Sequence, residues 1–217
     1  MRTFGFPEFL FILEAAKWTL ALSAIAFVGG AILGLAIALM RTSESTWARG
    51  ISTTFIQIFQ GTPLLLQLFL VFFGAPVLGL DINPWVAAGV ALILNSAAFL
   101  GEIWRGCIEA IPRGQWEAAE ALSLKYSSRM RDVVLPQALK IALAPTVGYV
   151  VQIIKGTSLA AIIGFVEVTR AGQIVNNATF QPLIVFSVVA AIYFVICWPL
   201  SLLAARMERK RARALAR

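Results

Sequence analysis

The chain contains several apolar runs long enough to cross a lipid bilayer as helices, and this feature constrains its fold most. The hydrocarbon core of a bilayer takes about 20 predominantly apolar residues per helix. Within that core every backbone amide and carbonyl needs an internal partner, so runs of this length fold as helices. Five candidate spans follow: Trp18–Met40, Ile51–Leu80, Trp85–Trp104, Gln137–Ile163 and Pro182–Arg206. The sequence therefore predicts an all-α membrane protein in which residues 1–217 form a single transmembrane domain.

The composition agrees with a lipid-embedded fold and removes several other classes of function. Hydrophobic residues make up 59% of the chain and charged residues only 13%, whereas soluble domains have about 25% charged residues. There is no histidine, and both cysteines lie in or beside apolar runs, so no metal site is expected. Although the net charge is +7, apolar runs separate the cations, so nucleic acid is not an expected partner. No motif of the form G-x-x-x-x-G-K-S/T occurs, and this chain is not expected to bind ATP itself.

Lysine and arginine gather in alternate connections between the candidate spans, which predicts how the chain crosses the membrane. They follow the first span, surround the loop after the third span and fill the tail at residues 206–217. The connection after the fourth span carries only Arg170 as a basic residue. Because positively charged connections stay in the cytoplasm, the N-terminus is predicted outside and the C-terminus inside. We interpret the basic tail mainly as a topological anchor to anionic lipid head groups.

The longest polar stretch, residues 112–136, is predicted to begin as an amphipathic helix rather than as a flexible linker. Trp116, Ala119 and Leu122 recur there at helical spacing. Glu117 is expected near the N-terminal end of this helix, where the helix dipole favours anions. A helix with one small apolar face either docks into a groove of another protein or lies as a solvated connector along the membrane interface. These residues alone leave both interpretations open.

Four segments resemble the permease subunits of ABC importers, in particular the polar amino-acid branch that takes up histidine, glutamine, glutamate or arginine. The most specific feature is Glu117-Ala118-Ala119 followed by Leu135-Pro136, which is similar to the EAA loop of that family. The four segments are GTPLLLQLF at Gly61–Phe69, GEIWRGCIEAIPRGQWEAAEAL at Gly101–Leu122, LPQALKIALAP at Leu135–Pro145 and KGTSLAAIIG at Lys155–Gly164. The resemblance therefore extends over nearly the whole chain.

The resemblance implies a type I ABC importer permease in a bacterial-type inner membrane, together with a set of partners. These are a second permease subunit of the same or a different chain, two cytoplasmic ATPase subunits that bind ATP and magnesium, and an extracytoplasmic solute-binding protein. Residues 112–136 are implied to form the EAA-type coupling loop, which sits on an ATPase subunit and transmits its closure to the spans. The implied coupling residues are Gly114, Trp116, Glu117, Ala118, Ala119, Ala121, Leu122 and Ser123. The family commonly has glycine where this chain has Ser123, which suggests a different exit from the helix or a slightly longer helix.

The second candidate span carries Gln60-Gly61-Thr62-Pro63 close to the bilayer midplane. These residues come about ten residues, or roughly 15 Å, after the predicted cytoplasmic start of the span. Pro63 suits the first position of a new helix, Thr62 is able to cap it, and Gly61 gives the backbone freedom to turn. Such a break aims free amides at the midplane, where they attract a substrate carboxylate. The alternative is a simple proline kink relieved by neighbouring helices.

Polar residues in other spans complete the predicted substrate site. Asn95 and Ser96 lie in the middle of the third span and are possible contacts, although hydrogen bonds between helices explain them equally well. Thr157 and Ser158 are able to line a cavity or to bond back to their own helix. The nearby Lys155 is expected to snorkel to the outer interface or to pair with an acid. The predicted substrate-binding residues are Gln60, Gly61, Thr62, Pro63, Leu64, Asn95, Tyr149, Gly156, Thr157 and Ser158.

Differences from part of the family bear on substrate charge. Members that resemble transporters of basic amino acids tend to carry carboxylates where this chain has Tyr149 and Gly156, and often arginine where it has Gln60. Desolvating a cationic side chain without a counter-ion costs several kcal/mol. The resemblance therefore implies a neutral or acidic amino acid, unless a non-identical partner permease holds the substrate.

Two interpretations from other classes stay open at this point. A membrane scaffold subunit of an enzyme complex needs contacts to a catalytic partner but no cavity at the midplane. A stand-alone secondary transporter is expected to carry internal repeats or ion-coordinating acids, and the sequence offers neither. The main prediction is a non-enzymatic permease subunit that moves polar amino acids or related small zwitterions into the cytoplasm, driven by an ATPase on another chain.

Overall fold

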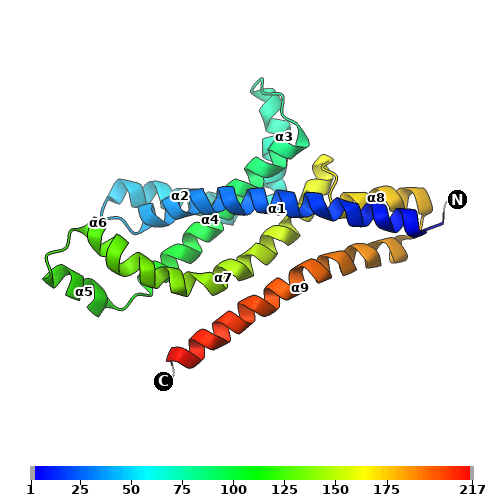
Figure 1. Cartoon of the computed structure of the whole chain (residues 1–217). Coiled ribbons are helices and arrows are strands. Elements are labelled where there is room, and N and C mark those ends of the chain that lie inside the picture. Colours follow the sequence, from blue (N-terminus) through cyan, green and yellow to red (C-terminus); the bar gives the residue numbers. More distant parts are fainter. Residues whose placement is uncertain (1–2, 216–217) are drawn as a thin grey trace.

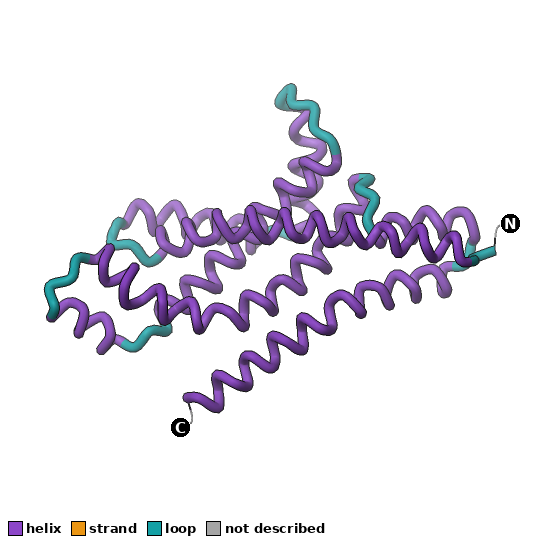
Figure 2. The backbone as a smooth tube through the Cα atoms, viewed as in Figure 1, coloured by secondary structure: helices purple, strands orange, loops and turns teal. Residues whose placement is uncertain are grey.

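The computed structural model of the chain describes residues 3–215, and this part consists of helices joined by short turns, as Figure 1 and Figure 2 show. A π-helical segment, Arg129–Val134, precedes α7, and a 3₁₀-helical segment, Thr157–Ile163, follows it. The predicted all-α fold is confirmed, because the described residues contain no strand. The helices are α1 Phe6–Arg41, α2 Thr46–Gly61, α3 Leu64–Val77, α4 Pro84–Glu109, α5 Arg113–Ala121, α6 Tyr126–Ser128, α7 Leu135–Gly156, α8 Val168–Thr179 and α9 Pro182–Leu215.

The predicted spans are present with one correction. Among the described residues, four helical stretches are long and apolar enough to cross a membrane: Phe6–Arg41, Pro84–Glu109, Tyr126–Ile163 and Pro182–Arg211. The remaining predicted span, Ile51–Leu80, is not one continuous helix, because α2 and α3 meet at a bend of 101°. Figure 1 shows α3 standing out of the bundle as a result. The described chain therefore has five spans only when this bent pair is taken as one of them.

The first helix begins well before the predicted position at Trp18. The backbone N–H of Gly5 donates to the Glu8 carboxylate at 3.0 Å, and this contact fixes a helix start at Phe6. Glu8, an acidic residue before the apolar run, serves here as a helix-start residue. α1 consequently extends beyond the apolar run that the sequence marks.

The two ends of the bundle carry different features. Figure 1 places α5 and the C-terminal end of α9 at one end, and α8 and the start of α1 at the other. The predicted topology requires this arrangement, because the coupling loop and the basic tail must share one side of the membrane. The tail predicted at residues 206–217 continues α9 as a helix to Leu215, and Arg217 lies outside the described residues. That this end faces the cytoplasm stays a prediction from the distribution of basic residues.

α1 and α4 form the most extensive helix pair of the fold. Their close approach depends on Gly30 and Gly34, which are spaced by four residues as in the glycine motifs of packed membrane helices. A Cβ atom built on Gly30 would lie 2.5 Å from the Cβ of Ser96, and one built on Gly34 would lie 3.1 Å from the carbonyl oxygen of Ala97. A larger residue at either position pushes the two helices apart. This pair is therefore the framework against which the other helices are placed.

The fold also buries the carboxylate of Glu167, the residue that precedes α8. It accepts hydrogen bonds from the backbone N–H groups of Thr169 and Arg170 at 2.9 Å each, and from the hydroxyl of Tyr193 in α9 at 2.6 Å. Three donors satisfy the buried oxygens, as a buried carboxylate requires. Glu167 thus caps α8 and ties it to α9. In the sequence it was recognisable only as a charge in a connection.

Candidate functional site

A cavity of about 450 Å³ opens beside the break between α2 and α3, against α4 and α7. None of its lining residues carries a formal charge, and the lining is a mixture of polar and apolar side chains. Its volume lies in the range of small-molecule sites. The lining residues are Thr62, Leu64, Leu92, Asn95, Ser96, Phe99, Tyr149, Gln152, Ile153 and Gly156. The cavity is therefore suited to a small polar solute without net charge on its side chain.

The break beside the cavity is built from extended backbone. α2 ends at Gly61, α3 begins at Leu64, and Thr62 and Pro63 between them have ψ angles of 141° and 135°. The predicted broken helix is thus present, and the alternative of a simple proline kink is wrong. Two details of the prediction are also wrong. Pro63 precedes α3 instead of starting it, and the Thr62 hydroxyl donates to the Ile58 carbonyl at 2.7 Å instead of capping α3.

Gln67 stabilises the break, although it was not among the predicted site residues. Its Nε2 lies 2.8 Å from the Phe59 carbonyl oxygen, 3.0 Å from the Thr62 carbonyl oxygen and 2.9 Å from the Thr62 hydroxyl. Carbonyls at the end of a helix lose their intrahelical donors, and the break creates such carbonyls at the end of α2. The buried amide of Gln67 supplies the missing donors. The sequence did contain a signal for this role, because Gln67 is a lone polar residue within the apolar run after Pro63.

The Gln67 side chain also connects the break to the other walls of the cavity. Its Oε1 accepts a hydrogen bond from Asn95 Nδ2 in α4 at 3.1 Å. The hydroxyl of Tyr149 in α7 lies 3.5 Å from Asn95 Oδ1, at the long end of hydrogen-bond distance. The ring of Tyr149 stacks on Phe99 with a centroid distance of 5.4 Å. One chain of side chains therefore fixes α3, α4 and α7 around the cavity.

The structure brings together only part of the predicted substrate-binding set. The members that line the cavity are Thr62, Leu64, Asn95, Tyr149 and Gly156. Gln60, Gly61 and Pro63 lie exposed beside the cavity at the break, and Gln60 Nε2 donates to the Ala98 carbonyl at 3.3 Å. Gly61 is the last residue of α2, so the chain turns one residue later than predicted.

Thr157 and Ser158 were predicted in the site but do not line this cavity. The 3₁₀-helical turn after α7 directs their hydroxyls back to the carbonyls of Ile154 and Lys155, each at 2.7 Å. The alternative, in which these residues bond to their own helix, is therefore the correct one. The side chain of Lys155 is exposed, and none of the ion pairs found among the described residues includes it.

Lining residues outside the predicted substrate-binding set are Leu92, Ser96, Phe99, Gln152 and Ile153, and of these only Ser96 was expected as a possible contact. Gln152 had a usable signal, because it lies three residues after Tyr149 and four before Gly156 and so shares their helix face. The apolar members had none, since leucine, phenylalanine and isoleucine are expected throughout a membrane helix. Which of them reach the cavity depends on how α4 and α7 cross.

The start of α3 adds a partial positive charge at the cavity. Leu66 and Gln67 are the first residues of α3 whose N–H groups bond to a backbone carbonyl, that of Pro63. The preceding amides of Leu64 and Leu65 belong to the orphan donors that every helix start leaves. Leu64 itself lines the cavity. A helix start of this kind is suited to bind a carboxylate.

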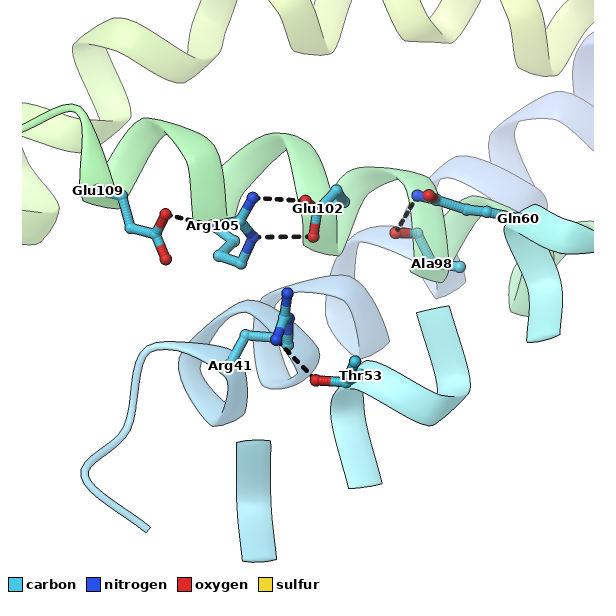
Figure 3. Close-up of polar contacts among 7 residues, drawn as sticks. All are labelled: Arg41, Thr53, Gln60, Ala98, Glu102, Arg105 and Glu109. Carbon is cyan, nitrogen blue, oxygen red and sulfur yellow. Dashed lines mark hydrogen bonds and ion pairs between the residues drawn. The ribbon is translucent and has the colours of Figure 1, made fainter. Parts of the chain in front are cut away.

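A charged ladder follows α4 from the cavity toward α5. Figure 3 shows Gln60 on Ala98, and further along α4 the side chain of Arg105 between Glu102 and Glu109. Arg105 Nη2 lies 2.5 Å from Glu102 Oε1, and its Nη1 pairs with Glu109. Partly exposed pairs of this kind along one helix contribute only about 0.3–0.5 kcal/mol each. The ladder thus makes the half of α4 that leads to α5 polar without holding it rigid.

The helix predicted in residues 112–136 is present as α5, but its apolar face is divided differently from the prediction. Trp116 is half-buried and Ala119 is buried, and both pack against the chain itself, whereas Leu122 is 74% exposed. Ala118 and Ala121 are exposed as well. The surface that α5 offers to another protein is therefore small, and it is formed by Gly114, Glu117, Ala118, Ala121 and Leu122.

The acidic residues of α5 do not occupy its first turn, so the expected interaction of Glu117 with the positive end of the helix is wrong. Glu117 lies in the middle of the helix and its side chain is exposed. Glu120 lies near the other end and pairs with Arg129 of the π-helical segment at 3.3 Å. The second of these acids thus holds α5 to the rest of the loop, while the first faces outward.

Ser123 ends α5 in the left-handed conformation, with φ of 57°. Its N–H donates to the Glu120 carbonyl at 2.8 Å, and the N–H of Leu124 donates to the Ala119 carbonyl at 3.2 Å. This is the helix exit that glycine normally provides. The expectation that serine would change the exit or lengthen the helix is wrong. The helix therefore ends in the usual left-handed conformation, and Ser123 bears the strain of a side chain at a positive φ.

Replacing Ser123 by glycine is expected to raise the free energy of unfolding by about 1 kcal/mol, because the left-handed conformation costs an L-residue that amount. Thermal unfolding of the purified chain in detergent measures the change. Ser127→Gly is the matched control, since Ser127 lies in a helical turn where glycine lowers stability. A Ser123→Gly protein no more stable than the wild type would show that the strain is absent.

Known proteins match this chain over nearly its full length. The family model for binding-protein-dependent transport system inner membrane components matches residues 19–213. The chain is 34% identical over 205 residues to the probable amino-acid ABC transporter permease protein YckA of Bacillus subtilis (strain 168), covering 94% of this chain and 91% of YckA. It is 36% identical over 206 residues to the glutamine transport system permease protein GlnP of Escherichia coli (strain K12), covering 94% of each. A crystal structure of an amino acid ABC transporter with histidines superposes with a TM-score of 0.87 at 32% identity, covering 96% of this chain and 100% of that one.

Proposed function

This chain belongs to the family of binding-protein-dependent transport system inner membrane components, and from that premise we propose that it carries polar amino acids or related small zwitterions as the permease subunit of an ABC importer. The observation that carries the substrate proposal is the uncharged cavity of about 450 Å³ beside the broken helix. The start of α3 suits a substrate carboxylate, and the amide and hydroxyl groups on the walls suit an amino group and a neutral side chain.

The charge of the cavity limits the substrate class. A lysine or arginine side chain entering it would meet no carboxylate among the lining residues. An uncompensated cation in such a site costs several kcal/mol, which disfavours basic amino acids and leaves neutral or acidic ones. An acidic side chain would likewise meet no cationic side chain among the lining residues, so neutral amino acids are favoured. Relatives named for amino-acid and glutamine transport support this class. The predicted neutral positions Gln60, Tyr149 and Gly156 lie in or beside the cavity, as the proposal requires.

The proposed importer contains partners that supply the energy and the substrate. A second permease subunit completes the pathway, two cytoplasmic ATPase subunits bind ATP and magnesium, and an extracytoplasmic binding protein delivers the amino acid. The α5 end of the bundle faces the cytoplasm, in agreement with the positive-inside rule. Family membership and the cavity favour this function over an enzyme scaffold or a stand-alone secondary transporter.

The coupling step follows from the connection between α4 and α5. Only Ala110, Ile111 and Pro112 separate the end of α4 from the start of α5. A push on α5 by a closing ATPase subunit is therefore transmitted to the helix that carries Asn95 and Ser96 into the cavity. Transport requires that the cavity alternate between outward-open and inward-open states, so that ATP shifts a two-state equilibrium.

Replacing Gly156 by valine tests the substrate site. A Cβ atom at this position would lie 3.2 Å from Cδ2 of Leu64, so a branched side chain intrudes on the cavity and its wall. We expect ATP-driven uptake by the assembled importer in proteoliposomes to fall roughly tenfold, which corresponds to about 1.4 kcal/mol. The measurement uses a panel of radiolabelled amino acids and reports which of them is carried.

Gly74→Val is the control for this experiment, because no atom lies within 4 Å of a Cβ built on Gly74. It is expected to leave uptake unchanged. Unchanged uptake in Gly156→Val, with normal assembly of the importer, would place the substrate in the partner permease or elsewhere in the complex.

A further inference from the structure

A second cavity, unrelated to the substrate site, lies between α1, the inner end of α4 and the start of α7. It has a volume of about 490 Å³, and nearly all of its surface is apolar. Its lining residues are Leu35, Trp104, Cys107, Ile108, Arg131, Leu135, Pro136, Ala138, Leu139 and Ala142. We refer to it as the inner groove.

The walls of the inner groove are fixed by the fold. The indole N–H of Trp104 in α4 donates to the hydroxyl of Thr146 in α7 at 2.9 Å, and this bond holds the indole ring against α7. Ala138 and Ala142 are buried and small, so the groove is deep along α7. The outer edge is formed by Leu139, which is 64% exposed. The groove is therefore a preformed apolar slot that opens to the surface of the bundle.

The inner groove lies close to the end of the bundle that carries α5 and the basic tail. Leu35 precedes the end of α1 at Arg41 by about 9 Å along the helix axis. Ile108 is the second-last residue of α4, and Leu135 begins α7. At this depth a slot in a membrane protein meets the boundary between acyl chains and head groups of one leaflet.

A cationic side chain stands at the rim of this slot. Arg131 lines the groove from the π-helical segment, its side chain is 89% exposed, and Asp132 lies 3.8 Å from it as a loose partner. An apolar slot with a cation at its mouth is complementary to a molecule that has an alkyl chain and an anionic head.

We propose that the inner groove binds an anionic phospholipid, with one acyl chain in the slot and the phosphate at Arg131. A second copy of the chain or a protein segment fits less well, because an apolar partner adds no counter-charge to the exposed Arg131, whose only ion pair in the described part of the chain is the 3.8 Å contact with its neighbour Asp132. The bound lipid bridges α1, α4 and the segment between α5 and α7. It therefore stiffens the junction through which the coupling loop is connected to the spans.

Native mass spectrometry of the full chain, exchanged into mixed micelles with equal phosphatidylglycerol and phosphatidylcholine, tests the proposal. The wild type is expected to retain phosphatidylglycerol about fivefold more than phosphatidylcholine, the effect of one cation near an anionic head group. Leu139→Trp fills the slot and is expected to lose retention of both lipids. Arg131→Gln keeps the slot and is expected to lose the preference for phosphatidylglycerol.

Matched controls exist on α7 and in the loop that carries Arg131. Leu143→Trp places the same side chain one turn along α7, at an exposed position outside the groove, and Arg113→Gln removes an exposed cation in α5. Both are expected to bind lipid as the wild type does.

Equal retention of the two lipids by the wild type, or unchanged retention in Arg131→Gln, would overturn the proposal. A lower dimer fraction in Leu139→Trp with unchanged lipid retention would assign the groove to a second copy of the chain. Because Arg131 is exposed, Arg131→Gln decides the matter even if Leu139→Trp does not fold.

Discussion

Replacing Glu117 by lysine is expected to abolish ATP-dependent uptake while leaving the chain folded in the membrane. Glu117 is exposed on α5, and none of the ion pairs found among the described residues includes it, so its loss removes no contact that holds the fold. In the proposed importer, an ATPase subunit docks on the surface formed by Gly114, Glu117, Ala118, Ala121 and Leu122. Reversing the charge at Glu117 would bring like charges together within that covered surface, at a cost of several kcal/mol.

The measurement separates docking from folding. Co-purification of the ATPase subunits reports docking, stimulation of their ATP hydrolysis reports coupling, and thermal unfolding reports the fold. Glu44→Lys is the matched control, because Glu44 is an exposed acid in the connection between α1 and α2, outside α5. Normal uptake in Glu117→Lys would remove the coupling role from α5. A lowered unfolding temperature would instead assign Glu117 to the fold.

The sequence predicted those features that depend on local pattern and on the length of apolar runs. The span that includes α4 follows from bilayer thickness alone, and its predicted end at Trp104 lies within the helix that ends at Glu109. The break at Thr62 and Pro63 follows from the missing amide of proline and from the midplane position. The helix at α5 follows from periodicity within a polar stretch. In each case the signal lies within a few consecutive residues.

Features that depend on the packing of distant segments were not predictable in this way. Gly30 and Gly34 could be read as small residues, but only the crossing of α1 and α4 shows that a Cβ atom there meets the backbone of α4. Trp116 and Ala119 looked like a docking face because helical periodicity marks an apolar face without saying what covers it. The π-helical segment packs against α5 within the same chain, and Trp116 packs on a cluster that includes Met130 and Val134 of that segment.

Ser123 and Thr157 illustrate a second reason for error, since both are polar residues with several local options. The sequence suggested that serine would avoid the left-handed conformation, yet two backbone hydrogen bonds hold Ser123 there. Thr157 looked able to face a cavity, but its hydroxyl bonds to a carbonyl three residues earlier. Local propensity is a weak preference, and the surrounding structure decides between the options.

Replacing Gln67 by leucine is expected to lower the free energy of unfolding by about 2–3 kcal/mol and to eliminate uptake. Hydrogen bonds between membrane helices contribute only about 0.6 kcal/mol on average, because the freed groups usually find other partners. At the break the Thr62 carbonyl cannot find such another partner, because it follows the last residue of α2 and precedes a proline, which has no N–H to donate. The Phe59 carbonyl retains only Asn95 Nδ2, at 3.4 Å. The penalty of leaving these partly buried carbonyls unsatisfied therefore outweighs the usual small value.

Gln57→Leu is the control for this substitution, because Gln57 is exposed in α2 and undergoes the same chemical change outside the break. Thermal unfolding in detergent and uptake in proteoliposomes are measured for both variants. Gln67→Leu is expected to lose both properties, since the carbonyls that it satisfies belong to the wall of the cavity. If uptake were lost at an unchanged unfolding temperature, Gln67 would contact the substrate rather than hold the break. If neither the unfolding temperature nor uptake changed, the break would be stabilised by its surroundings. The attraction of a carboxylate to the start of α3 would then not depend on the Gln67 amide.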